Sequence, residues 1–144
     1  MRLLVLLVLL SLAVASCEGF FDPPALREAQ VLRRSVLPGH EAVDEHAAEG
    51  LVSIGYYLME SLDGFVVVPE DAERRDRIDH PERGLRGIAE WSVTGPSGSD
   101  CFVFEDEVTE PRQWAARVND DAVVARIERG EAYLIRLAAG CSDH

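Results

Sequence analysis

The segment from His40 to His46 has the residue types of a metal site. It reads His-Glu-Ala-Val-Asp-Glu-His and begins like the H-E-x-x-H pattern, in which two His one helical turn apart bind zinc. Asp44 stands where that pattern has its second His, and a carboxylate can also bind zinc. His46 follows His40 by six residues, which places the two rings on different sides of a helix. An exposed face of an amphipathic helix explains these residues as well, so we expect neither a metal site nor a cofactor.

Three other groups of charged residues have the chemistry to bind ions. The acidic runs Glu105–Glu107 and Asp120–Asp121 offer the oxygen ligands that calcium prefers, but neither has the ligand spacing and central Gly of an EF-hand loop. A turn explains Asp120–Asp121. Arg74, Arg75 and Arg77 have the charge to bind an anion, but the carboxylates around them neutralise that charge. We therefore expect a solvated segment of mixed charge there.

No pattern in the chain predicts catalysis. The sequence contains neither a Gly-x-Ser-x-Gly elbow nor a glycine-rich phosphate loop before a helix. Pairs of carboxylates are numerous, but a chain this acidic produces them by chance. Trp91 and Trp114 fall on expected strands, where packing explains them more simply than a ligand platform does. We therefore expect no catalytic residue and a protein that is not an enzyme.

The N-terminus has the layout of an export signal. Met1-Arg2 precede an apolar run from Leu3 to Leu10, which continues as Ser11-Leu12-Ala13-Val14, and small residues follow. The run is too short to span a bilayer, which takes roughly 20 apolar residues. The string Val14-Ala15-Ser16-Cys17 resembles a lipobox, the cleavage site of bacterial lipoprotein signal peptidase. This resemblance implies that Cys17 becomes the first residue and carries diacylglycerol on its sulfur.

The lipobox sets the expected address. Residues 1–16 are then a signal peptide, residues 17–23 a tether, and the protein is lipid-anchored to a bacterial membrane, facing outside the cytoplasm, because two acyl chains anchor stably. Glu18 stands where inner-membrane lipoproteins usually have Asp, which favours the outer membrane and periplasm of a Gram-negative cell. Two alternatives stay open: an ordinary signal cut near Ala15, which leaves Cys17 as a thiol, or a buried N-terminal helix.

Cysteine arithmetic agrees with this compartment. Lipidation of Cys17 leaves an even pair, Cys101 and Cys141, in an oxidising space. A disulfide between them closes a loop of about 40 residues, for which chain entropy predicts roughly 3–4 kcal/mol of stabilisation. Two separate thiols are the alternative.

The charge balance excludes some partners. Residues 1–16 contain one Arg and no acid, so the remaining chain has 13 Arg against 26 Asp and Glu, a formal charge of −13. This argues against nucleic acid, because phosphate binding needs clustered cations. It also argues against flat adsorption on anionic lipid. The acidic surface keeps an anchored domain soluble, and it can also attract a basic partner.

Two helices are expected in the first half of the chain. Apolar residues recur at helical spacing over 24–36, after Pro23-Pro24 and before Pro38-Gly39. A second stripe advances by three or four residues and predicts a helix from Val43 to Leu62, ending at Asp63-Gly64. Its members are Val43, Ala47, Leu51, Ile54, Leu58 and Leu62. Gly50 and Gly55 weaken this helix, and a break there would leave 51–57 free to be a strand.

The second half is expected to form strands. Phe65–Val68 is a short β-branched run, and 69–86 is a charged loop. Strands at 88–93 and 101–104 flank a Gly-, Pro- and Ser-rich connection, as in a hairpin. A meander follows, with strands at 113–118, 122–127 and 131–137 and turns at 119–121 and 129–130. The sequence therefore predicts one α+β domain over 24–144, in which two N-terminal helices pack on an antiparallel sheet closed by a disulfide.

Residues 101–141 resemble a family of small exported bacterial proteins, many of them lipoproteins, whose function is unknown. The shared features are a Cys, the Val-Asn-Asp-Asp turn at 118–121, the Tyr-Leu-Ile-Arg-Leu strand at 133–137 and a second Cys. The resemblance implies the Cys101–Cys141 pairing and the meander. It implies no chemistry.

These observations favour a non-enzymatic envelope lipoprotein that binds another envelope component or stabilises an assembly. We expect the N-terminal lipid to attach this protein to the membrane. A small-ligand or metal-binding module, for calcium or zinc, is the first alternative, and a small enzyme of unrecognised type is the second.

Overall fold

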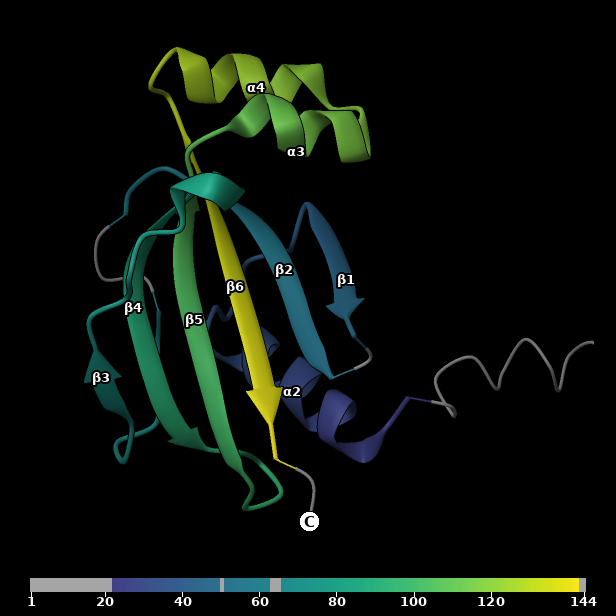
Figure 1. Ribbon diagram of the computed structural model, residues 1–144, viewed down its shortest axis with the longest axis vertical. Helices are drawn as coiled ribbons and strands as arrows, with labels where there is room; N and C mark the ends of the chain where they lie inside the picture. Colours follow the sequence, from purple (N-terminus) through teal and green to yellow (C-terminus); the bar gives the residue numbers. More distant parts are fainter. Residues whose placement is uncertain (1–21, 50, 63–65, 143–144) are drawn as a thin grey trace, which may run out of the picture.

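The computed structural model describes residues 22–49, 51–62 and 66–142 (Figure 1). The expected signal peptide, Cys17 and most of the expected tether lie outside these residues. Among the described residues, no helix is long and apolar enough to cross a membrane. The elements run in the order α2 (Pro24–Ser35), β1 (Asp44–Ala48), β2 (Val52–Met59), β3 (Glu73–Arg75), the 3-10 turn η2 (Pro81–Arg83), β4 (Leu85–Thr94), β5 (Asp100–Val108), α3 (Pro111–Val118), α4 (Asp121–Glu128) and β6 (Tyr133–Cys141).

The strands form one six-stranded sheet in the order β1-β2-β6-β5-β4-β3, and all neighbours are antiparallel. The expected α+β class and antiparallel sheet are therefore confirmed. The last strand of the chain, β6, lies in the middle, between β2 and β5. Its residues from Leu134 to Gly140 are all buried, because helices or side chains cover both of its faces. This explains why its sequence does not alternate between apolar and polar residues: it is apolar on both faces, apart from Arg136, which pairs with Asp106.

The helix α2 packs across one face of the sheet (Figure 1). Pro24 stands at its first turn, where a missing N–H is tolerated, as the sequence predicts. Its buried stripe meets side chains of β2, β4, β5 and β6 in one apolar cluster. The fully buried members of this cluster include Ala29, Val36, Val103, Ile135 and Leu137.

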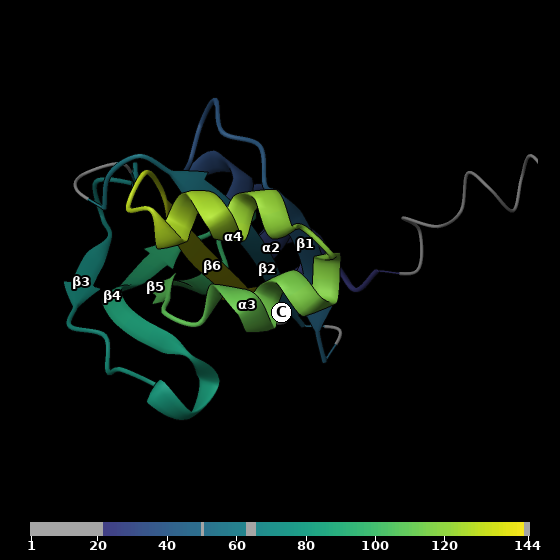
Figure 2. The ribbon, with the colours of Figure 1, turned by 90° about the horizontal axis from the view of Figure 1, so that it is seen from above.

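The short helices α3 and α4 lie over one end of the sheet, on the other side from α2 (Figures 1 and 2). Trp114, Ala115 and Val124 face a second apolar cluster that includes Leu134 and Ala138 of β6. The sheet thus has a core on each face, and β6 contributes its odd-numbered residues to one and its even-numbered residues to the other.

The predicted helix from Val43 to Leu62 is wrong, and with it the pair of N-terminal helices. This stretch forms β1 and β2, in line with the alternative in which Gly50 and Gly55 interrupt the helix. Steps of four residues keep one face in a strand as well as in a helix, so the stripe does not distinguish the two. Buried on both faces, β2 shows no alternation that would identify it.

The predicted strands at 113–118 and 122–127 are also wrong, since these residues form α3 and α4. Pro111 begins α3, and Asn119 ends it in the left-handed conformation. The side chain of Asp120 accepts a hydrogen bond from the Val123 N–H at 3.2 Å and so caps α4. The expected turn at 119–121 therefore joins two helices rather than two strands.

The other local predictions have mixed outcomes. The hairpin is confirmed and is longer than expected, because β4 and β5 extend to 85–94 and 100–108. Leu134–Leu137 lies in a strand as predicted, and Gly130 takes the left-handed turn conformation before it. Val66–Val68 is not a strand, although the Val67 N–H donates to the Val36 carbonyl at 2.8 Å, and Phe65 lies outside the described residues.

Asp106 is a buried carboxylate on the face of the sheet opposite α2. Its side chain is 0% exposed and accepts from Arg77 Nε at 2.9 Å and from Arg136 Nη1 at 3.3 Å. The Arg77 guanidinium also lies over the Phe104 ring, 4.1 Å from its centroid. The prediction of a solvated segment is therefore wrong for Arg77, whose side chain is 8% exposed and fastens the loop before η2 to the sheet.

Replacing Asp106 tests this fastening. We expect D106N to lower the free energy of unfolding by about 3–5 kcal/mol, because it removes the buried carboxylate that two guanidinium groups share. Arg77 keeps a second carboxylate, Glu90 at 3.3 Å, but for Arg136 no other ion pair is found among the described residues. Urea unfolding measures the change. The control D71N, at an exposed loop position, is expected to stay within about 0.5 kcal/mol of the parent. A D106N protein as stable as D71N would contradict the assignment.

Candidate functional site

A groove of about 580 Å³ lies between the C-terminal turn of α2 and the edge strand β1. Segment 40–43 forms one wall, and Arg34 of α2 and Tyr57 of β2 form the other. The Val43 N–H donates to the Tyr56 carbonyl at 2.7 Å, which holds this wall against the sheet. The residues lining the groove are Arg34, His40, Glu41, Ala42, Val43, Asp44, Glu45 and Tyr57.

Arg33 is the buried residue that builds this region. Its side chain is 1% exposed, although it is a cation. Its Nε donates to the Ser53 hydroxyl at 2.9 Å, its Nη1 donates to the Tyr57 hydroxyl, and its Nη2 donates to Glu45 Oε1 at 2.8 Å. One guanidinium therefore joins α2 to both β1 and β2. Such a buried cation is tolerated because its charge is paired and its N–H groups have acceptors.

Glu45 connects the buried charge to the groove. Besides Arg33, it accepts from Arg34 at 3.3 Å and 3.0 Å through its two oxygens. The hydrogen bonds from Arg34 and then Arg33 lower the pKa of Glu45 below its ordinary value, against the opposing effect of its partial burial. Burial raises the pKa of Tyr57, so its hydroxyl stays protonated. The wall of the groove is thus a fixed array of paired charges.

Gly55 leaves room for Arg33. A Cβ at this position would overlap the Arg33 guanidinium and press on the Tyr57 ring. Ser53, Gly55 and Tyr57 are alternate residues of β2, so they share the face that receives the guanidinium. Gly55, which argues against the helix predicted from the sequence, is therefore needed in the strand β2, because the buried Arg33 side chain lies directly against it.

The segment His40–His46, whose residue types resemble those of a metal site, lies partly in this groove. His40 and Glu41 precede β1 and Asp44 begins it, so the segment has no helical spacing. His46 Nδ1 lies 3.8 Å from Asp44 Oδ2, and its ring stacks on Tyr56 at 5.9 Å between centroids. In the described part of the chain, these residues do not converge as a set of metal ligands.

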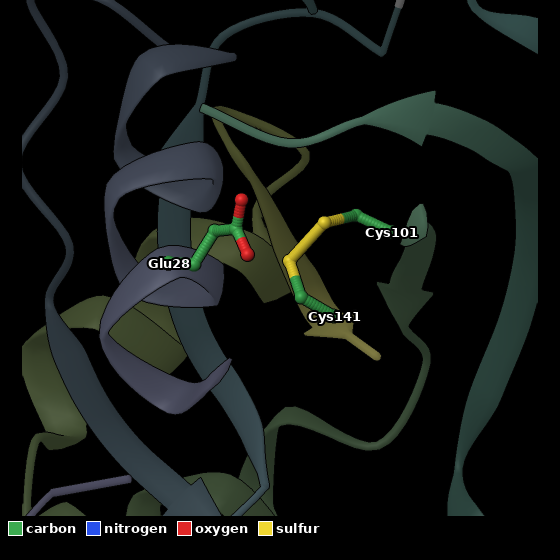
Figure 3. Close-up of side chains that lie close together, drawn as sticks. All are labelled: Glu28, Cys101 and Cys141. Atoms are coloured by element: carbon green, nitrogen blue, oxygen red, sulfur yellow. A yellow bond between two sulfur atoms is a disulfide. The ribbon is translucent and has the colours of Figure 1, made fainter. Parts of the chain in front are cut away.

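A second polar site joins α2 to the predicted disulfide, which is formed. Cys101 of β5 and Cys141 of β6 face each other in register. Figure 3 shows the carboxylate of Glu28, on α2, beside this bond. The Ser97 N–H donates to Glu28 Oε2 at 2.6 Å. A hydrogen bond with the Ser99 side chain, together with those from Ser97, lowers the pKa of Glu28 despite its burial.

This corner has the atoms of a metal site but not its chemistry. The Glu28 carboxylate and the two sulfurs lie within 4.8 Å of one another. Both sulfurs are bonded to each other, however, and a cysteine binds a metal as the free thiolate. The corner therefore fixes α2 and the loop at 95–99 to the strands, with Gly95 directly against Glu28 and Cys101.

The other acidic candidates already have partners. Glu105 accepts from the Trp91 indole at 3.0 Å, and burial raises the pKa of Glu105. Glu107 accepts from Arg86 at 2.6 Å. Asp106 is buried and also has partners. The carboxylates at 105–107 therefore all accept hydrogen bonds from protein side chains, and they do not form an open calcium site. Arg74 pairs with Asp76 at 3.2 Å on the exposed edge, as expected for a charged surface segment.

Sequence reasoning missed the two buried charges of α2. The signal was present, because Arg33 lies four residues before Leu37 and Glu28 four before Leu32, on the apolar side of the helix. Their partners Ser53 and Ser97 are distant in sequence, so the fold was needed to identify them.

The lowered pKa of Glu45 predicts an acid-sensitive contribution to stability. That contribution is present above the ordinary glutamate value of 4.5 and is lost as the pH falls through the lower folded-state value. We expect E45Q to destabilise the protein at pH 7 and to differ less from the parent near pH 3. Urea titrations at several pH values measure this.

The control is E128Q, which removes an exposed carboxylate paired with Arg112 at 2.9 Å. We expect it to change the free energy of unfolding by less than about 1 kcal/mol at pH 7. An E45Q effect that is independent of pH would show that Glu45 does not act through its charge.

Comparison with known proteins adds no relative to this geometry. The chain matches no protein-family model, no curated protein and no solved structure. The candidate site therefore rests on the residues and contacts described above.

Proposed function

We propose that this chain is a bacterial envelope lipoprotein that binds another envelope component, without catalysis, in the groove between α2 and β1. The groove is the observation that carries the proposal. It offers about 580 Å³ of open space, within the range of roughly 300–1,000 Å³ typical of ligand sites. Its wall is fixed by Arg33 and Glu45, so binding would require little ordering of the site.

The charge of the groove favours a basic partner. Arg33 and Arg34 more than neutralise Glu45, but Glu41 and Asp44 add two negative charges on the opposite wall, so these five side chains together carry a net charge of −1. The whole chain has a formal charge of −12, which strengthens the attraction of a cation. We therefore expect the partner to present a segment that contains Arg or Lys.

The edge position of β1 suggests how such a segment binds. In the described sheet β1 has one neighbour, β2, so its other side is open for backbone pairing. An extended segment that adds to β1 would gain main-chain hydrogen bonds and carry alternate side chains toward the groove. The charged residues of β1 discourage pairing with a copy of itself and favour pairing with a basic strand.

Three features support the location. The lipobox at 14–17 and the tether at 17–23 would carry the domain outside the cytoplasm, on a membrane. The Cys101–Cys141 bond agrees with that oxidising space. The resemblance of 101–141 to small exported bacterial proteins points to the same address.

Site-specific crosslinking in the native cell tests the proposal. A photo-reactive residue in place of Val43, which is 42% exposed and lines the groove, is expected to form one dominant adduct. The same residue at Ile78, which is 77% exposed on a loop outside the groove, is expected to form none. We expect E41K/D44K to reduce the Val43 adduct by about tenfold, because it replaces attraction by repulsion.

The matched control is E70K/D71K, which makes the same change of charge on an exposed loop and is expected to leave the adduct unchanged. An adduct that survives E41K/D44K, or that forms equally from Ile78, would overturn the proposal.

A further inference from the structure

A smaller cavity lies on the other face of the sheet, where α3 and the turn η2 meet the ends of β4 and β5. Its volume is about 190 Å³. Leu85 and Val108 form its apolar base, and Tyr56 and Trp114 contribute rings whose centroids are 6.3 Å apart. The groove beside β1 is lined by Tyr57, which points to the opposite face, so the two sites are independent.

The Trp114 indole N–H is an unpaired donor in this region. Trp114 is 4% exposed, and its Nε1 is the one buried side-chain polar atom of the described residues that lacks a hydrogen-bond partner. Trp91 differs, because its Nε1 donates to Glu105. A buried donor without an acceptor is costly and uncommon in native proteins, which points to an acceptor that arrives with a ligand.

Two opposite charges border the same cavity. Arg83 is the last residue of η2, and Glu110 is the residue that precedes α3. Gly84 packs against the Glu110 side chain. Among the described residues, neither Arg83 nor Glu110 forms an ion pair, whereas most other Arg side chains here do. A cation and an anion held at one opening without pairing suit a ligand that carries both charges.

We infer that this cavity binds a small zwitterion with a compact apolar body, of which a free apolar α-amino acid is the simplest example. The apolar body packs on Leu85, Val108 and the two rings. The carboxylate pairs with Arg83, and the ammonium pairs with Glu110. Because the Trp114 Nε1 is itself buried, a shift of the ring on binding turns its N–H toward the carboxylate, which then accepts from it. The volume lies below the roughly 300–1,000 Å³ of sites for drug-sized molecules, so the ligand is small.

Three matched probes distinguish this ligand from simpler ones: L-leucine, 4-methylpentanoate, which lacks the ammonium, and 3-methylbutan-1-amine, which lacks the carboxylate. The measurement is a ¹H–¹⁵N spectrum of the protein during titration, in which W91F assigns the two indole signals. We expect L-leucine to move the Trp114 signal saturably and to leave the Trp91 signal in place. Each single-charge probe is expected to bind about tenfold more weakly than L-leucine, because it lacks one charged hydrogen bond.

Rim variants separate the two charges. R83Q is expected to weaken L-leucine and 4-methylpentanoate about tenfold without affecting the amine, and E110Q to weaken L-leucine and the amine without affecting the acid. The control R112Q, whose side chain pairs with Glu128 instead, is expected to change nothing. A Trp114 signal that ignores all three probes, or that moves together with Trp91, would overturn the inference. So would R83Q and E110Q variants that do not differ in their response to 4-methylpentanoate and to 3-methylbutan-1-amine.

Discussion

The burial of the Arg33 guanidinium is the constraint on which the rest of the structure depends. A cation that is 1% exposed must have partners, and Ser53, Tyr57 and Glu45 supply them from two strands. This fixes where α2 crosses the sheet and requires a glycine at 55. It also draws Glu45, on the edge strand, toward the helix, which forms one wall of the groove. The proposed binding site is therefore a consequence of how the helix is fastened.

Buried charged side chains with fixed partners also occur at two other places in the fold. Glu28 fastens the first half of α2 to the loop at 95–99, beside the disulfide. Asp106 fastens the loop before η2 to the opposite face of the sheet through Arg77, and joins β5 to β6 through Arg136. A small domain has a limited apolar core, so buried charges with fixed partners define its geometry where apolar packing alone would not.

Sequence reasoning succeeded where local signals are sufficient. The first helix, the hairpin and the disulfide follow from proline and glycine positions, from an apolar stripe and from cysteine arithmetic. It failed at β2, because a strand buried on both faces has no period of two and its apolar residues also fit a helix. It failed at α3 and α4, because short segments that contain Trp, Val and Ile resemble strands unless Pro111 and Asp120 are recognised as helix starts.

The candidate site was harder to predict from the sequence than the fold was. His40, Glu41 and Asp44 stood out by residue type, and they do line the groove. Their chemistry there is different, because they form a charged wall and not a set of ligands on a helix. The roles of Arg33 and Glu28 could not be predicted from the sequence, because their hydrogen-bond partners come from β1, β2 and the loop at 95–99, which only the fold brings next to α2.

The proposed role requires this groove to face outside the cytoplasm, on a lipid, with the cystine formed. Intact-mass measurement of the protein extracted from its native membrane, before and after reduction, tests both conditions together. We predict a chain that begins at Cys17, carries the mass of a diacylglyceryl group and gains two hydrogens on reduction. An uncut chain that begins at Met1, has no lipid and gains no hydrogen would contradict the proposed location and the function that depends on it.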